Sequence, residues 1–589
     1  MIKVLLAAVN AKYIHSNLGV YSLKAYAEKK LAESGVQIEI EIGEYTINHQ
    51  REKILRDIYE RKPDIVGFSC YIWNISEIRA LVRDLPKVLP DAAIWLGGPE
   101  VSYDACSVLG ELPEAAGVMA GEGEETFAEL LRACWTAQGL EENQKSLGFE
   151  TDLAGIPGLI WRDRDGMIRQ NPDRRPLNMD DIPFAYKNLK DFENRIIYYE
   201  SSRGCPFSCS YCLSSIDKSV RFRSLELVKK ELNFFLEKRV PQVKFVDRTF
   251  NCKKSHAMAV WEYIRAHDNG VTNFHFEIAA DVLDEEEIRL LSGMRPGLVQ
   301  LEIGVQTVNP KTIKEIHRKM DLERVKTVVD RINLGKNIHQ HLDLIAGLPY
   351  EDLESFRESF DQVYQMRPQQ LQLGFLKVLK GSCMEEQAAS YDLAFTGEPP
   401  YEVLSTRWLS FGDVIQLKRV EEMVEVYYNS GQFLCTIRAL EREFARPFDL
   451  YQALAQWYQK KGMEEISQSR LMRFEHLFGF LKEKVPEKLE EYRDLLVMDL
   501  YLRENAKSRP SFARDQAPYK ISVRDFFIRE EKERRFLPDY RGRDSKQLAK
   551  MAHLEVMRDG TGVLFDYQNR DPLTNNARTV KLEGFAAND

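Results

Sequence analysis

Short apolar runs alternate with amphipathic helical patterns over the first 140 residues, and this alternation constrains the fold most. A doubly wound parallel sheet produces this pattern, because each strand must be joined to the next by a crossover helix. The predicted strands are Val4–Val9, Val36–Ile42, Ile65–Ser69, Ala93–Leu96 and Gly117–Ala120, with helices at about 18–34, 50–61, 75–86 and 124–137. We therefore predict an α/β multidomain protein that begins with a flavodoxin-like, Rossmann-like domain over residues 1–140.

A second alternation of strands and helices follows a connector at residues 141–190. The connector contains a β-hairpin signal, with Asp165 and Gly166 as its turn. Six further strands are predicted at Ile196–Ser201, Val243–Val246, Phe274–Ile278, Val299–Gly304, Gln340–Ile345 and Leu371–Val378. Six βα units are too few for a closed eight-stranded barrel, so we predict a partial (β/α)6 barrel over residues 191–385.

The last third of the chain changes character. Apolar residues recur at helical spacing through much of residues 386–589, which predicts a mostly α-helical C-terminal domain, and no motif indicates its role. A chain of 589 residues exceeds what one hydrophobic core supports, so three or four structural units are expected.

Charge and apolar runs limit the classes of protein to consider. The net charge of -9 gives no reason to expect general binding of nucleic acid. No apolar run approaches the roughly 20 residues that span a bilayer, and the N-terminus lacks the features of a signal peptide. We therefore expect a cytoplasmic protein whose thiols are kept reduced.

The segment RGCPFSCSYC places Cys205, Cys209 and Cys212 within eight residues and directly after a predicted strand. Structural zinc sites normally take four protein ligands, so a zinc site would need a fourth ligand such as Cys252 or His256. Thiolates are also the usual ligands of iron–sulfur clusters, and three of them would leave one iron of a [4Fe-4S] cluster open. Both metal sites are more plausible than three unrelated cysteines, since the chain has only nine.

The three cysteines, with Tyr211 before the last one, resemble the signature of the radical S-adenosylmethionine superfamily. The resemblance implies that the thiolates hold a [4Fe-4S] cluster whose open iron chelates S-adenosyl-L-methionine. It also implies reductive cleavage of that cofactor to a 5′-deoxyadenosyl radical, with electrons from a donor such as flavodoxin or ferredoxin.

Four later segments, FVDRTFN, EIAADVLDEE, EIGVQTVNP and DLIAGLPYED, are similar to the strand motifs of that superfamily and follow in the same order. Many relatives carry arginine at the position of Ala279, so that contact is absent here. The resemblance implies that S-adenosylmethionine is contacted by Tyr211, Asp247, Asn251, Glu277, Asp281, Glu302, Gln306, Ile345 and Gly347.

The first domain resembles the cobalamin-binding domains that precede some radical S-adenosylmethionine domains. NAKYIHSNLG, GFSCYIWN, LGGPE and AGEGEETF carry this resemblance. The Asp-x-His-x-x-Gly motif of many cobalamin proteins is altered, because Tyr13 stands two residues before His15, which makes cobalt ligation by His15 doubtful. The implied cobalamin contacts are Asn10, His15, Ser16, Asn17, Leu18, Ser69, Asn74, Gly97, Gly98, Gly121, Glu122 and Gly123.

Three functions are compatible with these resemblances. The leading hypothesis is methylation of an unactivated centre of an unknown substrate. The alternatives are a non-methylating radical oxidation, cyclisation or ring contraction, and a cobalamin or redox sensor without turnover. We expect the carboxyl edges of the two sheets to face one shared cavity. Cys252 and Cys383 are expected to be ordinary small apolar residues, with a catalytic thiol as the alternative for Cys383, which lies just after the sixth predicted strand.

Overall fold

The computed structural model describes residues 2–140, 153–216, 218–464, 466 and 468–585. The first sheet has the order β2-β1-β3-β4-β5-β6-β7. Its first five strands are parallel, in the order of a flavodoxin-like sheet. They are β1 (Ile2–Asn10), β2 (Ile38–Thr46), β3 (Ile65–Ser69), β4 (Ala93–Gly97) and β5 (Gly117–Met119). The predicted strand at Val36–Ile42 begins and ends later, because β2 pairs with β1 through to Asn10 and Thr46.

Helices cover both faces of this sheet. Side chains of α1 and α6 form the core on one face, and those of α2, α3 and α5 form the core on the other. The helices are α1 (Leu18–Glu33), α2 (Arg51–Arg61), α3 (Ile75–Val88), α4 (Pro99–Ser102), α5 (Ala105–Glu111) and α6 (Gly123–Leu140). The two short helices α4 and α5 were not predicted.

The predicted hairpin extends the first sheet. Its strands β6 (Leu159–Arg162) and β7 (Ile168–Gln170) pair antiparallel with each other, and β6 pairs antiparallel with β5. Gly166 has a φ of 75°, as the turn requires. The segment predicted as a connector therefore completes the edge of the first domain before the chain enters the barrel.

The second unit is a six-stranded, fully parallel partial barrel in the order β15-β14-β13-β12-β11-β8. The strands are β8 (Ile197–Tyr199), β11 (Gln242–Phe245), β12 (Asn273–Ile278), β13 (Val299–Gln306), β14 (His339–Ala346) and β15 (Gln370–Phe375). Along β13, buried and half-buried residues alternate strictly. One face therefore packs on the helices, and the other faces the lumen.

Helices pack outside the barrel strands and between them in sequence. They are α7 (Leu225–Glu237), α8 (Lys254–Ala266), α9 (Glu285–Ser292), α10 (Pro310–Glu315), α11 (Leu322–Gly335) and α12 (Leu353–Gln365). A short ribbon of β9 (Ser202–Arg203) and β10 (Arg221–Phe222) flanks the cysteine segment. A second ribbon, β16 (Ala394–Phe395) with β17 (Val403–Ser405), follows the short helix α13 (Cys383–Gln387) beyond the last barrel strand.

The C-terminal region is mostly helical, as predicted, and its first helices share a continuous core with the barrel. The helices are α14 (Phe411–Val424), α15 (Leu434–Leu440), α16 (Pro447–Lys460), α17 (Arg470–Lys484), α18 (Leu489–Arg503), α19 (Lys520–Glu533) and α20 (Ser545–Met551). An antiparallel sheet that was not predicted follows, with β18 (Ala552–Val556), β19 (Gly562–Arg570) and β20 (Ala577–Leu582).

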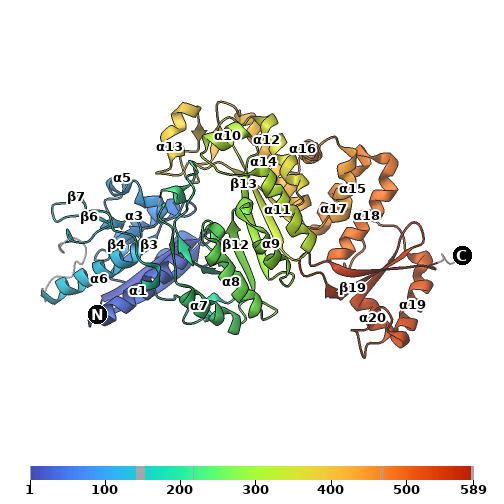
Figure 1. The fold of residues 1–589 in the computed structure, drawn as a ribbon, viewed down its shortest axis with the longest axis horizontal. Helices are drawn as coiled ribbons and strands as arrows, with labels where there is room; N and C mark the ends of the chain where they lie inside the picture. The colour runs from blue at the N-terminus through green and yellow to red at the C-terminus, as the bar shows by residue number, and fades with distance from the viewer. Residues whose placement is uncertain (1, 141–152, 217, 465, 467, 586–589) are drawn as a thin grey trace.

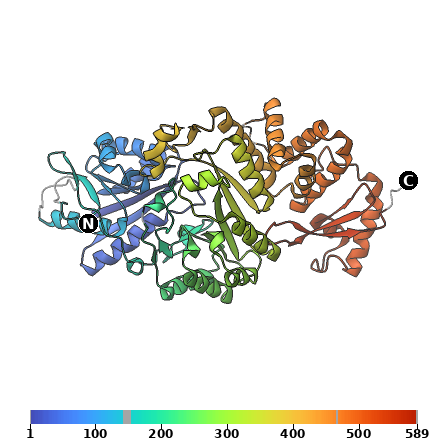
Figure 2. The ribbon, with the colours of Figure 1, turned by 45° about the horizontal axis from the view of Figure 1, so that its top comes forward.

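The first domain lies beside the barrel, and the C-terminal region lies on the opposite side of it (Figure 1, Figure 2). The two edge strands of the barrel sheet are β8 and β15. On the β8 side, Glu124 after β5 pairs with Arg203. On the β15 side, the hydroxyl of Tyr401 donates a 2.5 Å hydrogen bond to Glu100, which follows β4. The carboxyl edge of the first sheet thus contacts the segments that adjoin both edge strands of the barrel.

Within the described residues, no helix combines the length and the apolar character that crossing a membrane requires.

Candidate cluster and cofactor site

A cavity of about 200 Å³ lies at the carboxyl ends of the barrel strands. It brings together residues that are more than 130 positions apart, because parallel strands end at one edge of the sheet. The predicted site residues that line it are Cys205, Cys209, Tyr211, Cys212, Glu277, Asp281, Glu302 and Gln306.

The arrangement of the thiols bears on the choice between zinc and a cluster. Cys205 and Cys209 are buried and Cys212 is half-buried, and all three line the cavity. Their sulfur atoms do not all lie within 4.8 Å of one another among the described residues. A structural zinc site needs a fourth protein ligand beside these three thiols, whereas a four-iron cluster held by three thiolates does not.

The two candidate fourth ligands for zinc do not join the cysteines. Neither His256 nor Cys252 lines the cavity. The Nε2 atom of His256 lies 3.0 Å from the hydroxyl of Ser201, which occupies this nitrogen. The donor set at the cavity therefore fits a cluster held by three thiolates better than a four-ligand zinc site.

Arg318 is the cation nearest to these thiols among the contacts that we observe. Its Nη1 lies 3.8 Å from the sulfur of Cys209 and 3.4 Å from the hydroxyl of Tyr211, and its Nη2 donates to the carbonyl of Gly304. Burial raises the pKa of the Cys209 thiol, and the charge of Arg318 opposes this rise. Arg318 thus favours the thiolate, which is the form that binds metal.

Asp247 and Asn251 lie beside the cavity, but their side chains are used inside the protein. Asp247 is fully buried and accepts hydrogen bonds from the backbone and hydroxyl of Ser201, at 3.0 and 2.7 Å, and from the hydroxyl of Ser202, at 2.5 Å. Asn251 donates to the carbonyl of Ala279 and accepts from its N–H, at 2.8 and 2.9 Å. These two side chains order the loops that follow β8 and β12.

Glu277 and Glu302 face the cavity from neighbouring strands, β12 and β13. Burial, and then the charge of Glu302, raise the pKa of Glu277 to about 7. Burial also tends to raise the pKa of Glu302, but the hydrogen bond with His275 and the charge of Lys244 outweigh it and lower this pKa to about 2. Glu302 is therefore ionised at neutral pH, whereas Glu277 titrates close to neutrality.

The other predicted contacts are placed differently. Gln306 lines the cavity at a bulge in β13 and has a φ of 72°. Asp281 also lines the cavity, and its carboxylate accepts a 3.0 Å hydrogen bond from the N–H of Asp321. Ile345 and Gly347 do not line it. A Cβ on Gly347, whose φ is 91°, would meet Val403 at 2.8 Å, so packing against β17 requires this glycine.

Several charged residues that line the cavity were not predicted. They are Arg248, Arg318, Lys319 and Asp343. Arg248 stands just after the end of β11, which is the position that identified other candidates, whereas Asp343 lies within β14. Arg318 and Lys319 follow α10 on a loop, where neither periodicity nor a motif marks them.

The loop after β1 is held against the barrel. The Nδ1 atom of His15 lies 2.6 Å from the hydroxyl of Tyr198 on β8, and Ser16 Oγ donates a 3.0 Å hydrogen bond to the carbonyl of Ile196. Leu18, the first residue of α1, packs against the core of the barrel. These three predicted cobalamin contacts therefore lie at the boundary between the two units.

The predicted amides of the first domain organise its carboxyl edge. Asn17 caps α1 and donates a 3.0 Å hydrogen bond to Ser69 Oγ, while Asn10 donates to the carbonyl of His15 at 3.1 Å. Asn74 is 1% exposed and donates to the carbonyls of Val9 and Ser69, at 3.0 and 2.9 Å. Their amide groups thus join the loops that follow β1 and β3.

The glycine-containing loops lie at the same edge. Gly97 is the last residue of β4. Gly98 has a φ of 113° and lies against the backbone of Cys70, so that an added Cβ would be 2.5 Å from the carbonyl oxygen of Cys70. Gly121 and Gly123 flank Glu122 after β5. Glu122 itself accepts a 2.9 Å hydrogen bond from the N–H of Leu177 and pairs with Arg221.

The loop after β3 approaches the cavity that is lined by the three cysteines, which we call the cluster cavity. The rings of Tyr71 and Trp73 stack with centroids 4.4 Å apart, and Trp73 is 44% exposed. Burial raises the pKa of Tyr71, while the charge of Arg248, on the wall of the cluster cavity, acts to lower it. The first domain is therefore within electrostatic range of the cavity in the barrel.

Comparisons with known families agree with this arrangement. Residues 4–131 match the family described as B12 binding domain, and residues 199–363 match the Radical SAM superfamily. The chain belongs to the cobalamin-binding radical S-adenosylmethionine enzymes. Residues 389–573 of this radical S-adenosylmethionine enzyme match a third family, described as a protein of unknown function (DUF4080).

Curated relatives of this radical S-adenosylmethionine enzyme include methyltransferases. An uncharacterized methyltransferase of Pyrococcus horikoshii is 24% identical over 357 residues, which are 58% of this chain and 73% of that protein. The cobalamin-dependent radical SAM methyltransferase TokK of Streptomyces tokunonensis is 24% identical over 52% of this chain and 45% of TokK. An anaerobic magnesium-protoporphyrin IX monomethyl ester cyclase of Rubrivivax gelatinosus is 22% identical over 58% of this chain and 62% of the cyclase.

Solved structures share the fold. The cobalamin-dependent S-adenosylmethionine radical enzyme OxsB superposes with a TM-score of 0.58 at 13% identity, over 85% of this chain and 83% of OxsB. The methyltransferase TsrM of Kitasatospora setae, solved with cobalamin and a [4Fe-4S] cluster, gives a TM-score of 0.53 at 18% identity, over 68% of this chain and 79% of TsrM.

Proposed function

We propose that this radical S-adenosylmethionine enzyme binds cobalamin and a [4Fe-4S] cluster and methylates an unactivated centre of its substrate. One observation carries the proposal: three thiols line a cavity at the carboxyl ends of the barrel strands, and the carboxyl edge of the first domain contacts segments that adjoin both edge strands of the barrel. The methyltransferases among the curated relatives support this reaction over the alternatives.

The residues that would hold each group follow from the geometry. Cys205, Cys209 and Cys212 would hold the cluster, and the acidic wall of the cavity would hold S-adenosylmethionine. The loops after β1, β3, β4 and β5 would hold cobalamin. When bound, the cluster supplies the electron that cleaves S-adenosylmethionine, and cobalamin supplies a carrier for the methyl group.

The side chains of the enzyme would prepare this site. Arg318 favours the thiolate of Cys209, and Asp247 orders the segment that leads into the cysteines. Glu302 is held ionised by His275 and Lys244, so it can accept hydrogen bonds from a hydroxyl of the bound nucleoside. Glu277, with a pKa of about 7, can donate or accept a proton in the same space.

The proposal is tested with enzyme purified without oxygen and reconstituted with iron, sulfide and hydroxocobalamin. We expect about four irons and one cobalamin per chain. With a chemical reductant in place of flavodoxin or ferredoxin, we expect 5′-deoxyadenosine from S-adenosylmethionine. Cys205→Ala should lose both iron and 5′-deoxyadenosine, whereas Cys383→Ala, which changes an exposed thiol outside the cavity, should keep both.

Other outcomes separate the alternatives. Full iron retention in Cys205→Ala would reject the cluster assignment. A loaded enzyme without 5′-deoxyadenosine would indicate a sensor. Formation of 5′-deoxyadenosine without transfer of labelled methyl to any product would favour the oxidation, cyclisation or ring contraction chemistry, to which the cyclase relative belongs.

A further inference from the structure

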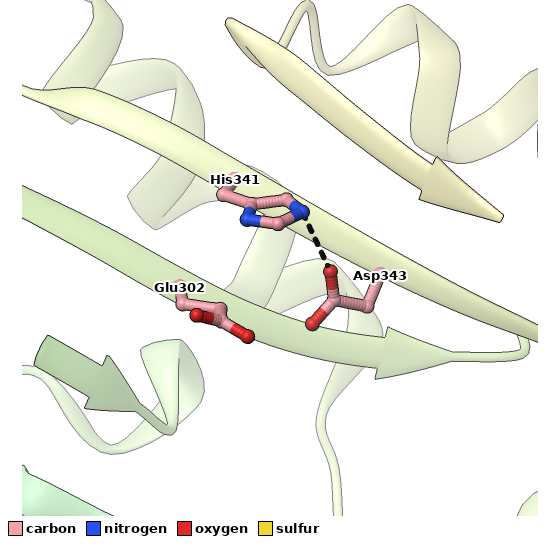
Figure 3. Close-up of side chains that lie close together, drawn as sticks. All are labelled: Glu302, His341 and Asp343. Atoms are coloured by element: carbon pink, nitrogen blue, oxygen red, sulfur yellow. Dashed lines mark ion pairs between the residues drawn. The ribbon is translucent and has the colours of Figure 1, made fainter. Parts of the chain in front are cut away.

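Three side chains on two adjacent barrel strands lie close together, and two of them, Glu302 and Asp343, line the cavity that contains the three cysteines. Glu302 on β13 is the register partner of His341 on β14, and Asp343 follows His341 by two residues on the same face of that strand. One ligand atom from each of the three lies within 4.8 Å of the others. Figure 3 shows His341 and Asp343 next to each other, with Glu302 on the neighbouring strand.

His341 is buried and forms an ion pair with Asp343. Its side chain is 9% exposed, and its Nε2 lies 3.0 Å from Oδ1 of Asp343. Neither atom makes a hydrogen bond of normal geometry with the described residues. The imidazole and the carboxylate therefore face each other at ion-pair distance without the alignment of an N–H···O hydrogen bond.

A shared cation explains this close but misaligned contact. Metal–ligand bonds of about 2.1 Å place neighbouring ligands of an octahedron about 3.0 Å apart, and they require no N–H···O alignment between the ligands. Lys244 donates a 3.0 Å hydrogen bond to Oε2 of Glu302, and Nε2 of His275 lies 3.0 Å from the same oxygen. Metal-binding carboxylates are commonly oriented by such outer partners.

We propose that Glu302, His341 and Asp343 bind a divalent first-row cation such as Mn²⁺, Fe²⁺ or Zn²⁺. One imidazole and two carboxylates suit these ions, and the absence of sulfur from this set separates the site from the cysteine loop. Glu302 and Asp343 also line the cluster cavity, so the cation would face the space that receives the substrate and could bind an oxygen atom there.

The proposal does not rest on the proposed function, because it can be tested without the cluster. The probe is Mn²⁺ or Zn²⁺, titrated into the full-length chain after chelator treatment, in a background where Cys205, Cys209 and Cys212 are alanine. This background removes the thiolates that would otherwise take zinc. We expect one equivalent of Mn²⁺ or Zn²⁺ per chain, measured by metal analysis and by the electron paramagnetic resonance of Mn²⁺.

The variants His341→Gln and Asp343→Asn should each weaken the affinity at least tenfold. The matched control is His339→Gln, because His339 lies on the same face of β14 two residues earlier and is outside the three-residue set. Thermal unfolding provides a second readout, since a bound cation raises Tm in the background chain and in the control but not in the two variants.

Two results would overturn the site. One is the failure of both Mn²⁺ and Zn²⁺ to bind at one equivalent. The other is unchanged affinity in His341→Gln and Asp343→Asn, which would place the bound metal elsewhere. Neither result would affect the test of the cluster, which measures iron in the chain with its cysteines intact.

Discussion

Arg203, two residues before the first cysteine of the cavity, forms an ion pair with Glu124 of the first domain. Both side chains are largely buried, and Arg203 also bonds to Glu200 at 2.9 Å. Burial tends to raise the pKa of Glu124, but the charge and hydrogen bond of Arg203 outweigh burial and lower it. The pair links the cobalamin-type domain directly to the segment that carries the thiols.

Glu124→Gln should therefore destabilise the enzyme, because it leaves the guanidinium of Arg203 buried with less opposing charge. Breaking a buried pair from one side costs about 3–5 kcal/mol. We expect a clearly lower Tm in thermal unfolding. Glu125→Gln is the matched control, since Glu125 is 37% exposed and its contact with Arg174 is 3.5 Å long. Equal Tm values for the two variants would show that the pair does not hold the domains together.

Asp247→Asn should loosen the segment before Cys205. The carboxylate of Asp247 accepts three hydrogen bonds from Ser201 and Ser202. In the variant, the side-chain NH2 of asparagine would face at least one of these three donors, which would then lose its acceptor. An unsatisfied buried donor costs about 1–3 kcal/mol. We expect lower stability in urea and faster loss of iron from the reconstituted enzyme.

The control for this change is Asp352→Asn at the N-cap of α12, where asparagine is an equally good cap. Wild-type rates of iron loss in Asp247→Asn would mean that Asp247 does not position the cluster segment.

Gly98→Ala should destabilise the first domain. The φ of 113° is outside the range that alanine adopts, and the added Cβ would lie 2.5 Å from the carbonyl oxygen of Cys70. Strained backbone of this kind costs roughly 1–3 kcal/mol before the clash is counted. We expect a lower urea midpoint and weaker binding of hydroxocobalamin, because the loops after β3 and β4 are forced apart.

Gly110→Ala in α5 is the matched control, since nothing lies within 4 Å of its added Cβ. It should be neutral or stabilising by up to about 1 kcal/mol, because alanine favours helices. A Gly98→Ala enzyme as stable as this control would contradict the argument.

Asp499 should give the C-terminal region a pH-dependent stability. Burial raises its pKa from 3.8 to about 6, although the N–H groups of Cys435 and Thr436 bond to it. The folded state therefore binds this proton more tightly than the unfolded state, so the contribution of Asp499 to stability falls as the pH rises from about 4 to 6 and is constant above that.

Urea unfolding of wild type and Asp499→Asn at several pH values measures this contribution, because other groups cancel in the difference. Relative to the variant, wild type should lose stability between pH 4 and 6. Parallel profiles would show that Asp499 keeps an ordinary pKa in the folded protein.

Much of the architecture could be predicted because it depends on the spacing of apolar residues within short segments. Ile65–Ser69 is a strand in the structure with the predicted bounds, and the parallel order of both sheets follows from the alternation with helices. The last sheet was missed, although Asp559 and Gly560 supply a turn between β18 and β19. Its strands were obscured by the helical periodicity that dominates the preceding residues.

Site residues could be predicted only as far as their position on a strand. The thiols were found because three cysteines lie within one short segment. Asp247 was predicted to contact a cofactor, but the fold commits its carboxylate to Ser201 and Ser202. The position of a polar residue at the end of a strand shows that its side chain lies near the cavity. It does not show which groups that side chain bonds to.

By itself, the sequence determined the strand–helix alternation and the three-thiol segment, since both depend on the spacing of neighbouring residues. The tertiary structure alone decided that Glu302 meets His341, and that Glu124 meets Arg203, 79 residues further along the chain. Such contacts depend on strand register and on how two domains dock. Both are set by the packing of distant apolar faces, which local spacing does not encode.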